Sequence, residues 1–219
     1  MLVKDCMTRH PIMISPETPA EEAERLMVEN GIRHLPVVED GKRLVGLLTR
    51  SRLSLKPDAM GSLNVWEISR YVSNVKVRDL MVKRRALKSI EPDRAIERAA
   101  AVMSEHRIGC LPVVDADFSV VGIVTEIDVF AAFEEMLGLP RDGIRVTVRM
   151  RNQPGEFAKL IGVLAARQWG VMGIGTFPSP RKDGYYDAVI KIPDVTLDDV
   201  QAELSKLEGQ QIVDIRAVT

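Results

Sequence analysis

The sequence predicts an α+β fold in which two tandem β-α-β-β-α units precede a β-α-β-β-α-β domain. Leu35–Val38 recurs as Leu111–Val114, about 76 residues later, and a fixed internal period indicates a repeated supersecondary unit. From residue 144 to 219, strand-like alternation is interrupted by two amphipathic helical patterns. The 219 residues are enough for two domains of ordinary size.

Composition and charge exclude several classes of protein. The chain is 46% apolar and 28% charged, which is typical of a soluble globular protein. Its net charge of -1 gives no field that would attract nucleic acid or an acidic membrane, so neither is an expected partner. No apolar run reaches the roughly 18 residues of a membrane-spanning helix, and Cys6 and Cys110 are too few for a disulfide framework. We therefore expect a cytoplasmic protein.

Each repeated unit reads as a helix followed by a hairpin. In the first unit, Thr18 before Pro19 has the pattern of an N-cap with proline at the first helical position. Asp93 supplies the corresponding cap in the second unit. Residues 34–38 and 44–49 are rich in branched side chains and flank a turn, which predicts a buried hairpin.

The repeat and the turn residues set the expected boundaries. The first unit covers 1–55 and the second 77–137, with a linker at 56–76 that contains proline and glycine. Residues 144–219 form the third domain, whose element order is the ferredoxin-like arrangement. Thr196 is expected to cap its second helix.

Motifs in these segments resemble two known families. Ile32–Val38 and Gly122–Asp128 resemble CBS motifs, which occur in pairs as a Bateman module, and the second string matches the family's Gly-x-x-Thr/Ser-x-x-Asp signature. Residues 144–219 resemble an ACT domain, whose mark is the turn Asn152–Gly155. The resemblance implies an adenosyl nucleotide (AMP, ADP, ATP or S-adenosylmethionine) as the regulatory ligand of the CBS pair. It also implies an amino acid at the ACT domain.

Thr125 and Asp128 are the predicted core of the nucleotide site. A strand that ends at Thr125 and enters a helix presents free N–H groups and the positive end of the helix dipole, which favour a phosphate. Thr125 and Asp128 lie one turn apart. Thr125 can bond a phosphate oxygen, and the ionised Asp128 can accept both ribose hydroxyls. The alternative is that both residues only cap the helix.

The first unit departs from this signature, because Arg52 stands where the aspartate is expected. Arginine has no acceptor for a ribose hydroxyl, so this site is expected to hold nucleosides poorly. Arg50 and Arg52 either reach a phosphate in the neighbouring cleft or are solvated. Lys83, with the two arginines that follow it, is either a polyphosphate clamp or a solvated turn.

The remaining candidate residues come from the resemblance. The walls around the base are expected to include Ala86, Leu87, Ile108 and Pro112. The effector turn of the ACT domain is expected to contribute Asn152, Pro154 and Gly155, with a small ligand approaching the Gly155 backbone.

Two further patterns are interpreted as packing. His34 and Cys110 occupy equivalent places in the two units, but two ligands without a neighbouring carboxylate are weak support for a metal site, and none is expected. The Gly173–Gly175 segment lacks the third glycine and the following helix of a dinucleotide loop, so it is expected to be small-residue packing in a strand.

These features favour a regulatory binding protein. The combined architecture resembles acetoin-utilisation proteins, which implies an unidentified regulated partner in acetoin-type carbon metabolism, and the family implies a homodimer. No catalytic motif is present, so no catalytic residue is assigned. The alternative is a detached regulatory arm of, or subunit for, a metabolic enzyme, with no ligand of its own. A DNA-binding regulator is disfavoured, because a basic helix-turn-helix is missing.

Overall fold

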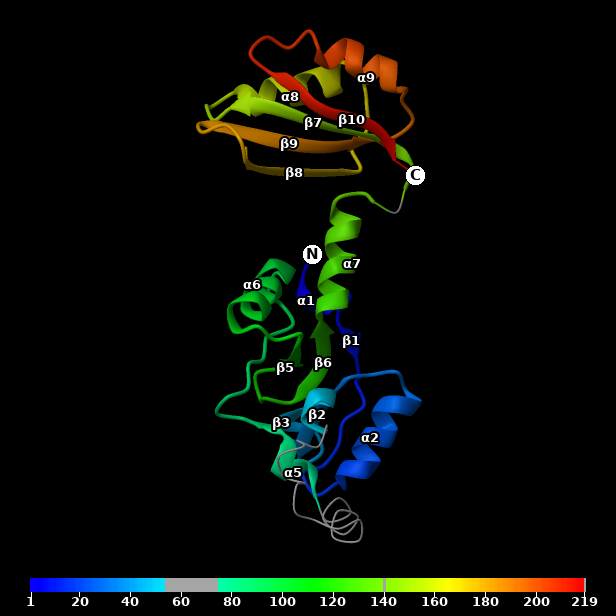
Figure 1. Ribbon diagram of the computed structural model, residues 1–219, viewed down its shortest axis with the longest axis vertical. Helices are drawn as coiled ribbons and strands as arrows, with labels where there is room; N and C mark the ends of the chain where they lie inside the picture. Colours follow the sequence, from blue (N-terminus) through cyan, green and yellow to red (C-terminus); the bar gives the residue numbers. More distant parts are fainter. Residues whose placement is uncertain (54–74, 140, 219) are drawn as a thin grey trace, which may run out of the picture. The chain divides into compact units, whose positions relative to one another are not determined.

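The computed structural model describes residues 1–53, 75–139 and 141–218, so most of the predicted 56–76 linker lies outside the described residues. The chain forms two compact units, Met1–Val129 and Phe130–Thr219. Each is an α/β unit with antiparallel sheets (Figure 1). No helix among the described residues is long and apolar enough to cross a membrane.

The first unit contains two three-stranded sheets, ordered β1-β6-β5 and β2-β3-β4. Its elements are, in chain order, α1 (Val3–Cys6), β1 (Thr8–Arg9), α2 (Ala20–Glu29), β2 (His34–Glu39), β3 (Arg43–Thr49), α3 (Arg50–Leu53), α5 (Val77–Leu80), β4 (Val82–Lys83), α6 (Ile96–His106), β5 (Cys110–Val114), β6 (Val120–Thr125) and the first residues of α7 (Glu126–Met136), a helix that continues into the second unit. The two predicted hairpins are therefore confirmed as β2-β3 and β5-β6.

The two repeats exchange their leading segments. β1 precedes the first hairpin in sequence but pairs with β6 of the second, and β4 precedes the second hairpin but pairs with β3 of the first. A glycine makes room for each exchange: a Cβ at Gly122 would overlap with the Met7 side chain, and one at Gly46 with that of Met81. Each sheet thus contains strands from both repeats.

The prediction that Thr18 caps α2 and Asp93 caps α6 is wrong. Both residues lie in segments that contact the exchanged segment of the other repeat. α2 begins at Ala20 and α6 at Ile96, and neither has a side-chain cap. The residues before α2 are held extended by residues 75–77, because Val77 N–H donates to Thr18 O over 3.0 Å. Asp93 instead forms an ion pair with Lys4. In the second unit, the cap by Thr196 is confirmed, since its hydroxyl accepts from Asp199 N–H at 3.2 Å.

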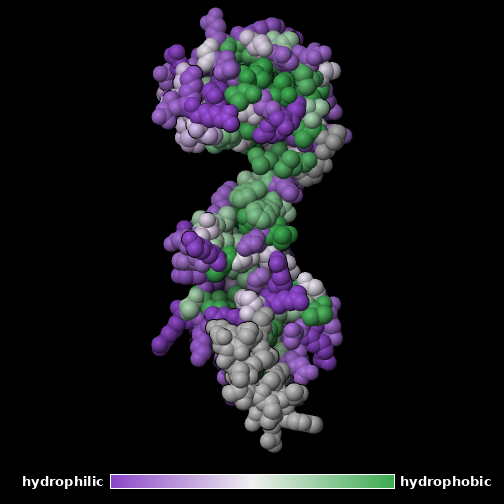
Figure 2. Space-filling model, viewed as in Figure 1, coloured by the Kyte–Doolittle hydropathy of each residue, from purple (hydrophilic) through white to green (hydrophobic). Residues whose placement is uncertain are grey.

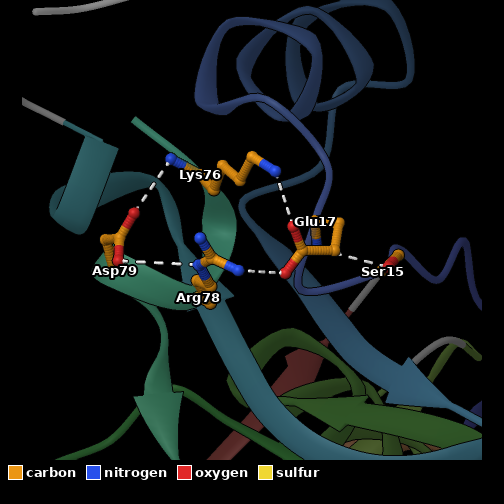
Figure 3. Close-up of polar contacts among 5 residues, drawn as sticks. All are labelled: Ser15, Glu17, Lys76, Arg78 and Asp79. Carbon is orange, nitrogen blue, oxygen red and sulfur yellow. Dashed lines mark hydrogen bonds and ion pairs between the residues drawn. The ribbon is translucent and has the colours of Figure 1, made fainter. Parts of the chain in front are cut away.

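A cluster of charged side chains joins the start of α2 to the segment around α5 (Figure 3). Glu17 accepts hydrogen bonds from Lys76 and Arg78, and the carboxylate of Asp79 accepts from the Lys76 backbone N–H at 3.2 Å. The bond from Lys76 is the main cause that lowers the pKa of Glu17. The two bonds to Glu17 join residues about 60 positions apart in sequence, and they add to the backbone hydrogen bonds between Thr18 and Val77 and between Ala20 and Val75.

The second unit is a four-stranded antiparallel sheet, ordered β10-β7-β9-β8. Its elements are β7 (Gly143–Arg151), α8 (Glu156–Ala166), β8 (Gly173–Pro178), β9 (Tyr185–Ile192), α9 (Leu197–Leu204) and β10 (Gln211–Val218). Both helices lie on one side of the sheet (Figure 1). Alternate strand residues such as Val146 and Ile190 pack against Leu160 and Val200. The predicted β-α-β-β-α-β order is present.

The glycines of β8 are explained by close packing. A Cβ at Gly173 would overlap with the backbone of Leu137, and a Cβ at Gly175 would lie 3.4 Å from the Leu137 side chain. The Gly173–Gly175 segment therefore packs beneath the chain that leads into β7, as the small-residue interpretation predicts.

We expect Gly173→Ala to destabilise the second unit by about 1 to 3 kcal/mol, the usual effect of forcing a methyl group into a filled space. Gly162→Ala in α8 is the matched control, because its Cβ would meet nothing within 4 Å, and it should stabilise the helix by about 0.5 to 1 kcal/mol. Urea unfolding of both variants measures the difference. Equal stabilities for the two variants would contradict the packing of Leu137 on Gly173.

Candidate functional site

The candidate site lies where β6 ends and α7 begins. Val124 is fully buried and anchors the strand, whereas Thr125 and Asp128 are half-buried. One carboxylate oxygen of Asp128, Oδ2, accepts from the Thr125 backbone N–H at 2.7 Å and from the Thr125 hydroxyl at 2.8 Å. Thr125 and Asp128 are therefore close together, as predicted, and they hold each other in position at the first turn of an 11-residue helix.

These contacts are those of a helix cap, so the capping interpretation of Thr125 and Asp128 has direct support. They leave the second carboxylate oxygen, Oδ1, without a hydrogen bond to any described residue. A carboxylate offers about four acceptor positions, so the cap uses only part of its capacity. Capping and ligand binding are therefore compatible at this position.

The equivalent junction in the first repeat has different chemistry. The Thr49 hydroxyl lies 3.0 Å from that of Ser51, and Arg52 donates to the backbone carbonyl of Leu80 at 3.3 Å. The Arg52 side chain thus ties α3 to the end of α5. Arg50 is exposed at the start of α3.

Lys83 and Ala86 lie beside the first repeat's hairpin. Lys83 pairs with Gly46 of β3, the Ala86 N–H donates to Lys83 O at 2.9 Å, and both side chains are exposed. Arg84 stacks over the ring of Phe118, 4.3 Å from its centroid. The structure therefore groups Lys83 and Ala86 with the strand leading to Thr49 and Arg50. It does not place them beside β6.

Leu87, Ile108 and Pro112 belong to the apolar surroundings of the hairpins. Leu87 packs against Leu47 and Ile123, one residue from each hairpin. Pro112 is buried and pairs with Ile123, and Ile108 is half-buried just before β5. These three predicted wall residues lie within or next to the sheet that ends at Thr125.

The exchange brings an unpredicted segment beside the candidate site. Thr8 and Arg9 of β1 pair with Ile123 and Gly122 of β6. Burial and then the charge of Asp128 raise the pKa of Cys6. Val3–Met7 is similar in sequence to Val77–Met81, but this similarity does not indicate which strand the segment pairs with.

Cys110 lies at the end of β5 facing Thr125, where it is 3% exposed. Burial, and secondarily the charge of Glu126, raise its pKa to about 12. Burial and Arg33 lower the pKa of His34, against the effect of Glu126. A raised pKa disfavours the thiolate form of Cys110, which is the form that binds metal. Within the described ranges, no three His, Cys, Asp or Glu side chains are grouped to hold a metal ion.

Two cavities can be compared with the predicted ligand positions. One of about 570 Å³ in the first unit adjoins the β2-β3 turn and contains no predicted site residue; it is lined by Met13, Ile14, Ser15, Val38, Glu39, Asp40 and Gly41. One of about 380 Å³ in the second unit is lined by Met150, Arg151, Asn152, Gln153, Glu156, Phe157, Ile174, Gly175, Thr176, Tyr186 and Ala188.

The second cavity includes only one of the three predicted effector residues. Asn152 lines it, but Pro154 and Gly155 do not. Gly155 has φ of +88° directly before α8, a conformation that favours glycine, and a Cβ there would meet open space. Its glycine is therefore required by the turn itself.

The CBS domain family matches residues 3–55 and 77–135, just over half of the chain. The chain belongs to the CBS domain family. The two matched segments contain the two repeats, so the resemblance of the repeats to CBS motifs is confirmed. The two CBS motifs together form a CBS pair, which is a regulatory module.

The curated relatives that match the CBS pair include one of unknown function and one enzyme. The uncharacterized protein MJ1225 of Methanocaldococcus jannaschii is 35% identical over 135 residues, which cover 60% of this chain and 47% of that protein. The homoserine O-acetyltransferase of Methanosarcina acetivorans is 31% identical over 134 residues, which cover 61% of this chain and 22% of that protein. This chain therefore spans less than half the length of these relatives.

Two solved structures resemble the CBS pair. A putative acetoin utilization protein (AcuB) from Vibrio cholerae has a TM-score of 0.52 and 31% identity, covering 64% of this chain and 95% of that chain. CBSX2, a CBS-pair protein of Arabidopsis thaliana, was solved in complex with AMP; the TM-score is 0.50 and the identity 29%, covering 60% of this chain and 95% of that chain.

Proposed function

We propose that this protein is a regulatory sensor whose CBS pair binds one adenosyl nucleotide at the β6-α7 junction. The main support is the free carboxylate oxygen of Asp128, held by Thr125 at the start of α7. A second support is CBSX2, which is similar to this CBS pair and is in complex with AMP.

In this site, each residue has a separate role. Oδ1 of Asp128 accepts from a ribose hydroxyl, and the charge makes this bond stronger than one to a neutral acceptor. Thr125 bonds a phosphate oxygen or orients Asp128. The positive end of the α7 dipole favours a negatively charged group, although the backbone N–H of Glu126 already donates to Gly109 O and that of Asp128 to the Thr125 hydroxyl. Leu87, Ile108 and Pro112 provide apolar surface for the base.

The first repeat plays a different part. Arg52 has no acceptor for ribose, and its bond to Leu80 O occupies part of the side chain. Arg50 and Lys83 are exposed near the same strand, where they attract the phosphates of a bound polyphosphate without selecting the nucleoside.

We further propose that the second unit is an ACT domain that binds an amino acid. The β-α-β-β-α-β order and the Asn152–Gly155 turn support this assignment. The cavity beside Asn152 offers the space, and Gly155 and Pro154 shape the turn at its side. The effector would then contact Asn152 rather than the Gly155 backbone.

The regulated partner is proposed to be an enzyme of acetoin-type carbon metabolism. The similarity of the CBS pair to AcuB supports the pathway. The homoserine O-acetyltransferase relative supports the idea that such pairs occur with enzymes. The alternative, a detached arm that binds no ligand and only assembles with an enzyme, is favoured by the complete capping geometry of Thr125 and Asp128.

Titration calorimetry and affinity capture separate these functions. The full chain is titrated with AMP, ADP, ATP, S-adenosylmethionine and each amino acid, and a tagged chain is then used to capture proteins from a lysate with and without the ligand that binds. The sensor predicts heat with at least one adenosyl compound and a capture that depends on it. A captured enzyme together with no heat for any compound would favour the detached arm.

The exposed apolar face of α7 predicts a homodimer. Ile127 and Phe130 lie one turn apart and are 62% and 59% exposed, and Figure 2 shows apolar surface over α7. Burial of such side chains between two copies is favourable. Light scattering at micromolar concentration should give at least the mass of a dimer, and Phe130→Glu should lower it. A monomeric wild-type protein would contradict the prediction.

A further inference from the structure

Two cationic side chains lie side by side on the sheet face of the second unit that α8 and α9 do not cover. Val146 and Ile190 face the helices, so the alternating residues Arg145 and Lys191 point to the opposite face. Arg145 on β7 and Lys191 on β9 are direct cross-strand partners. Like charges in this position repel each other.

Lys191 is buried without a carboxylate. It is 2% exposed, and its ammonium donates to the backbone carbonyl of Leu139 at 3.3 Å. Among residues 1–53, 75–139 and 141–218, no Asp or Glu forms an ion pair with it. A buried charge ordinarily needs a partner, so Lys191 has capacity for an anion.

The carboxylate that contacts Arg145 does not neutralise both cations of this face. Its guanidinium donates to Asp214 at 3.0 Å, but Asp214 also accepts from Arg216, so one carboxylate serves two guanidinium groups. The nearby Asp187 is already held by Arg149 through two hydrogen bonds. Asp187 and Asp214 are therefore already paired with arginines, and no other described Asp or Glu pairs with Lys191.

A cavity of about 400 Å³ opens onto these two cations. Its walls are mainly apolar, and no side-chain carboxylate of the described residues lines it; the lining residues are Leu137, Leu139, Arg145, Gly175, Thr176, Phe177, Val189, Lys191 and Val218. The Leu137 segment, packed on Gly173, forms one wall. This volume is in the range of small-ligand sites.

We propose that this cavity binds a short-chain organic carboxylate that lacks an α-ammonium group. The carboxylate lies between Lys191 and Arg145 and receives charge-assisted hydrogen bonds, while the hydrocarbon chain packs against Leu137, Leu139 and Val189. An amino acid is excluded, because its ammonium would enter beside two cations with no carboxylate to accept it. Inorganic phosphate is disfavoured, because it leaves the apolar walls unused.

This site differs from the proposed amino-acid site beside Asn152. The two cavities share Gly175 and Thr176 of β8, but Asn152 lines only one and Lys191 only the other. The inference is independent of nucleotide binding, because every lining residue belongs to the second unit.

The test compares isocaproate with leucine, which has the same carbon skeleton and adds the α-ammonium. Calorimetry of the full chain should show isocaproate binding that Lys191→Met weakens by roughly 10- to 100-fold, the usual range for a charge-assisted bond. Leucine should show no signal that depends on Lys191. Lys206→Met, at an exposed lysine of the same unit, is the control and should bind isocaproate like the wild type.

Melting temperatures, measured with and without isocaproate, show whether weaker binding by Lys191→Met results from unfolding. Without ligand, Lys191→Met should melt at or above the wild-type temperature, because it removes a repelling buried charge, and isocaproate should raise the melting temperature of the wild type alone. Arg145→Gln should weaken binding in the same direction. The proposal is overturned if isocaproate gives no heat and no melting shift at millimolar concentration, or if it stabilises Lys191→Met as much as the wild type.

Discussion

Replacing Asp128 with alanine is expected to weaken binding of an adenosyl nucleotide by about 10- to 150-fold, because a charge-assisted hydrogen bond contributes roughly 1.5 to 3 kcal/mol. The variant removes the free Oδ1 and the acceptor for both Thr125 donors. The cap is lost as well, and we expect a cost of about 1 kcal/mol in stability. Calorimetry on protein shown to be folded by its melting curve measures the binding effect.

Two variants separate the nucleoside contact from the phosphate contact. Arg52→Ala should leave adenosine binding unchanged. If Arg52 also attracts phosphates, its loss should weaken ATP more than adenosine, and the penalty should shrink in high salt. Asp128→Asn keeps a capping side chain but loses the charge, so it should bind nucleotide weakly while melting near the wild type. If the Asp128→Ala protein is folded and binds the nucleotide with wild-type affinity, the nucleotide site does not lie at the β6-α7 junction.

Replacing Asp187 with asparagine is expected to lower the melting temperature of the second unit by about 10 °C or more. The side chains of Asp187 and Arg149 are 4% and 16% exposed, and two hydrogen bonds of 2.8 and 2.9 Å join them. Removing the carboxylate charge leaves a largely buried guanidinium poorly paired. Asp183→Asn, in the β8-β9 turn, is the control and should have little effect.

The effect of Asp187→Asn should depend on pH. The hydrogen bond from Arg149 is the main cause that lowers the pKa of Asp187 below its ordinary value of 3.8. A carboxyl group with a lowered folded-state pKa contributes stability above its unfolded pKa and loses it as the pH falls through the folded one. Melting curves of wild type and variant should therefore differ at pH 7, begin to converge only below about pH 4, and meet as the pH falls through the lowered folded-state pKa of Asp187. A constant difference across this range would contradict the ion pair.

The sequence predicts the elements of this protein better than their pairing. The repeated hairpins and the β-α-β-β-α-β order follow from local patterns of apolar residues. The exchange of β1 and β4 does not, because the two repeats are alike and either hairpin satisfies the same apolar pattern. Ala86, expected from the family resemblance beside the base, and Lys83, expected as a phosphate clamp or a solvated turn, lie next to β3 in the structure.

The wrong prediction of the Thr18 cap also results from contacts between segments that are far apart in sequence. Thr18 has the sequence of a cap, but the backbone at this position is used for pairing with residues 75–77. Thr125 and Asp128 were predictable because their contact lies within one helical turn, where spacing determines which side chains meet. Lys191 was not singled out, because its burial depends on Leu139, which is 52 residues away.

The stoichiometry of nucleotide binding tests the central claim most directly. Calorimetric titration of the full chain with the adenosyl nucleotide that binds most tightly is predicted to give one nucleotide per chain. Of the two equivalent strand-helix junctions that the structure describes, the β6-α7 junction offers a carboxylate to the ribose and the β3-α3 junction has Arg52 instead. Two nucleotides per chain, or no heat with AMP, ADP, ATP and S-adenosylmethionine, would contradict it.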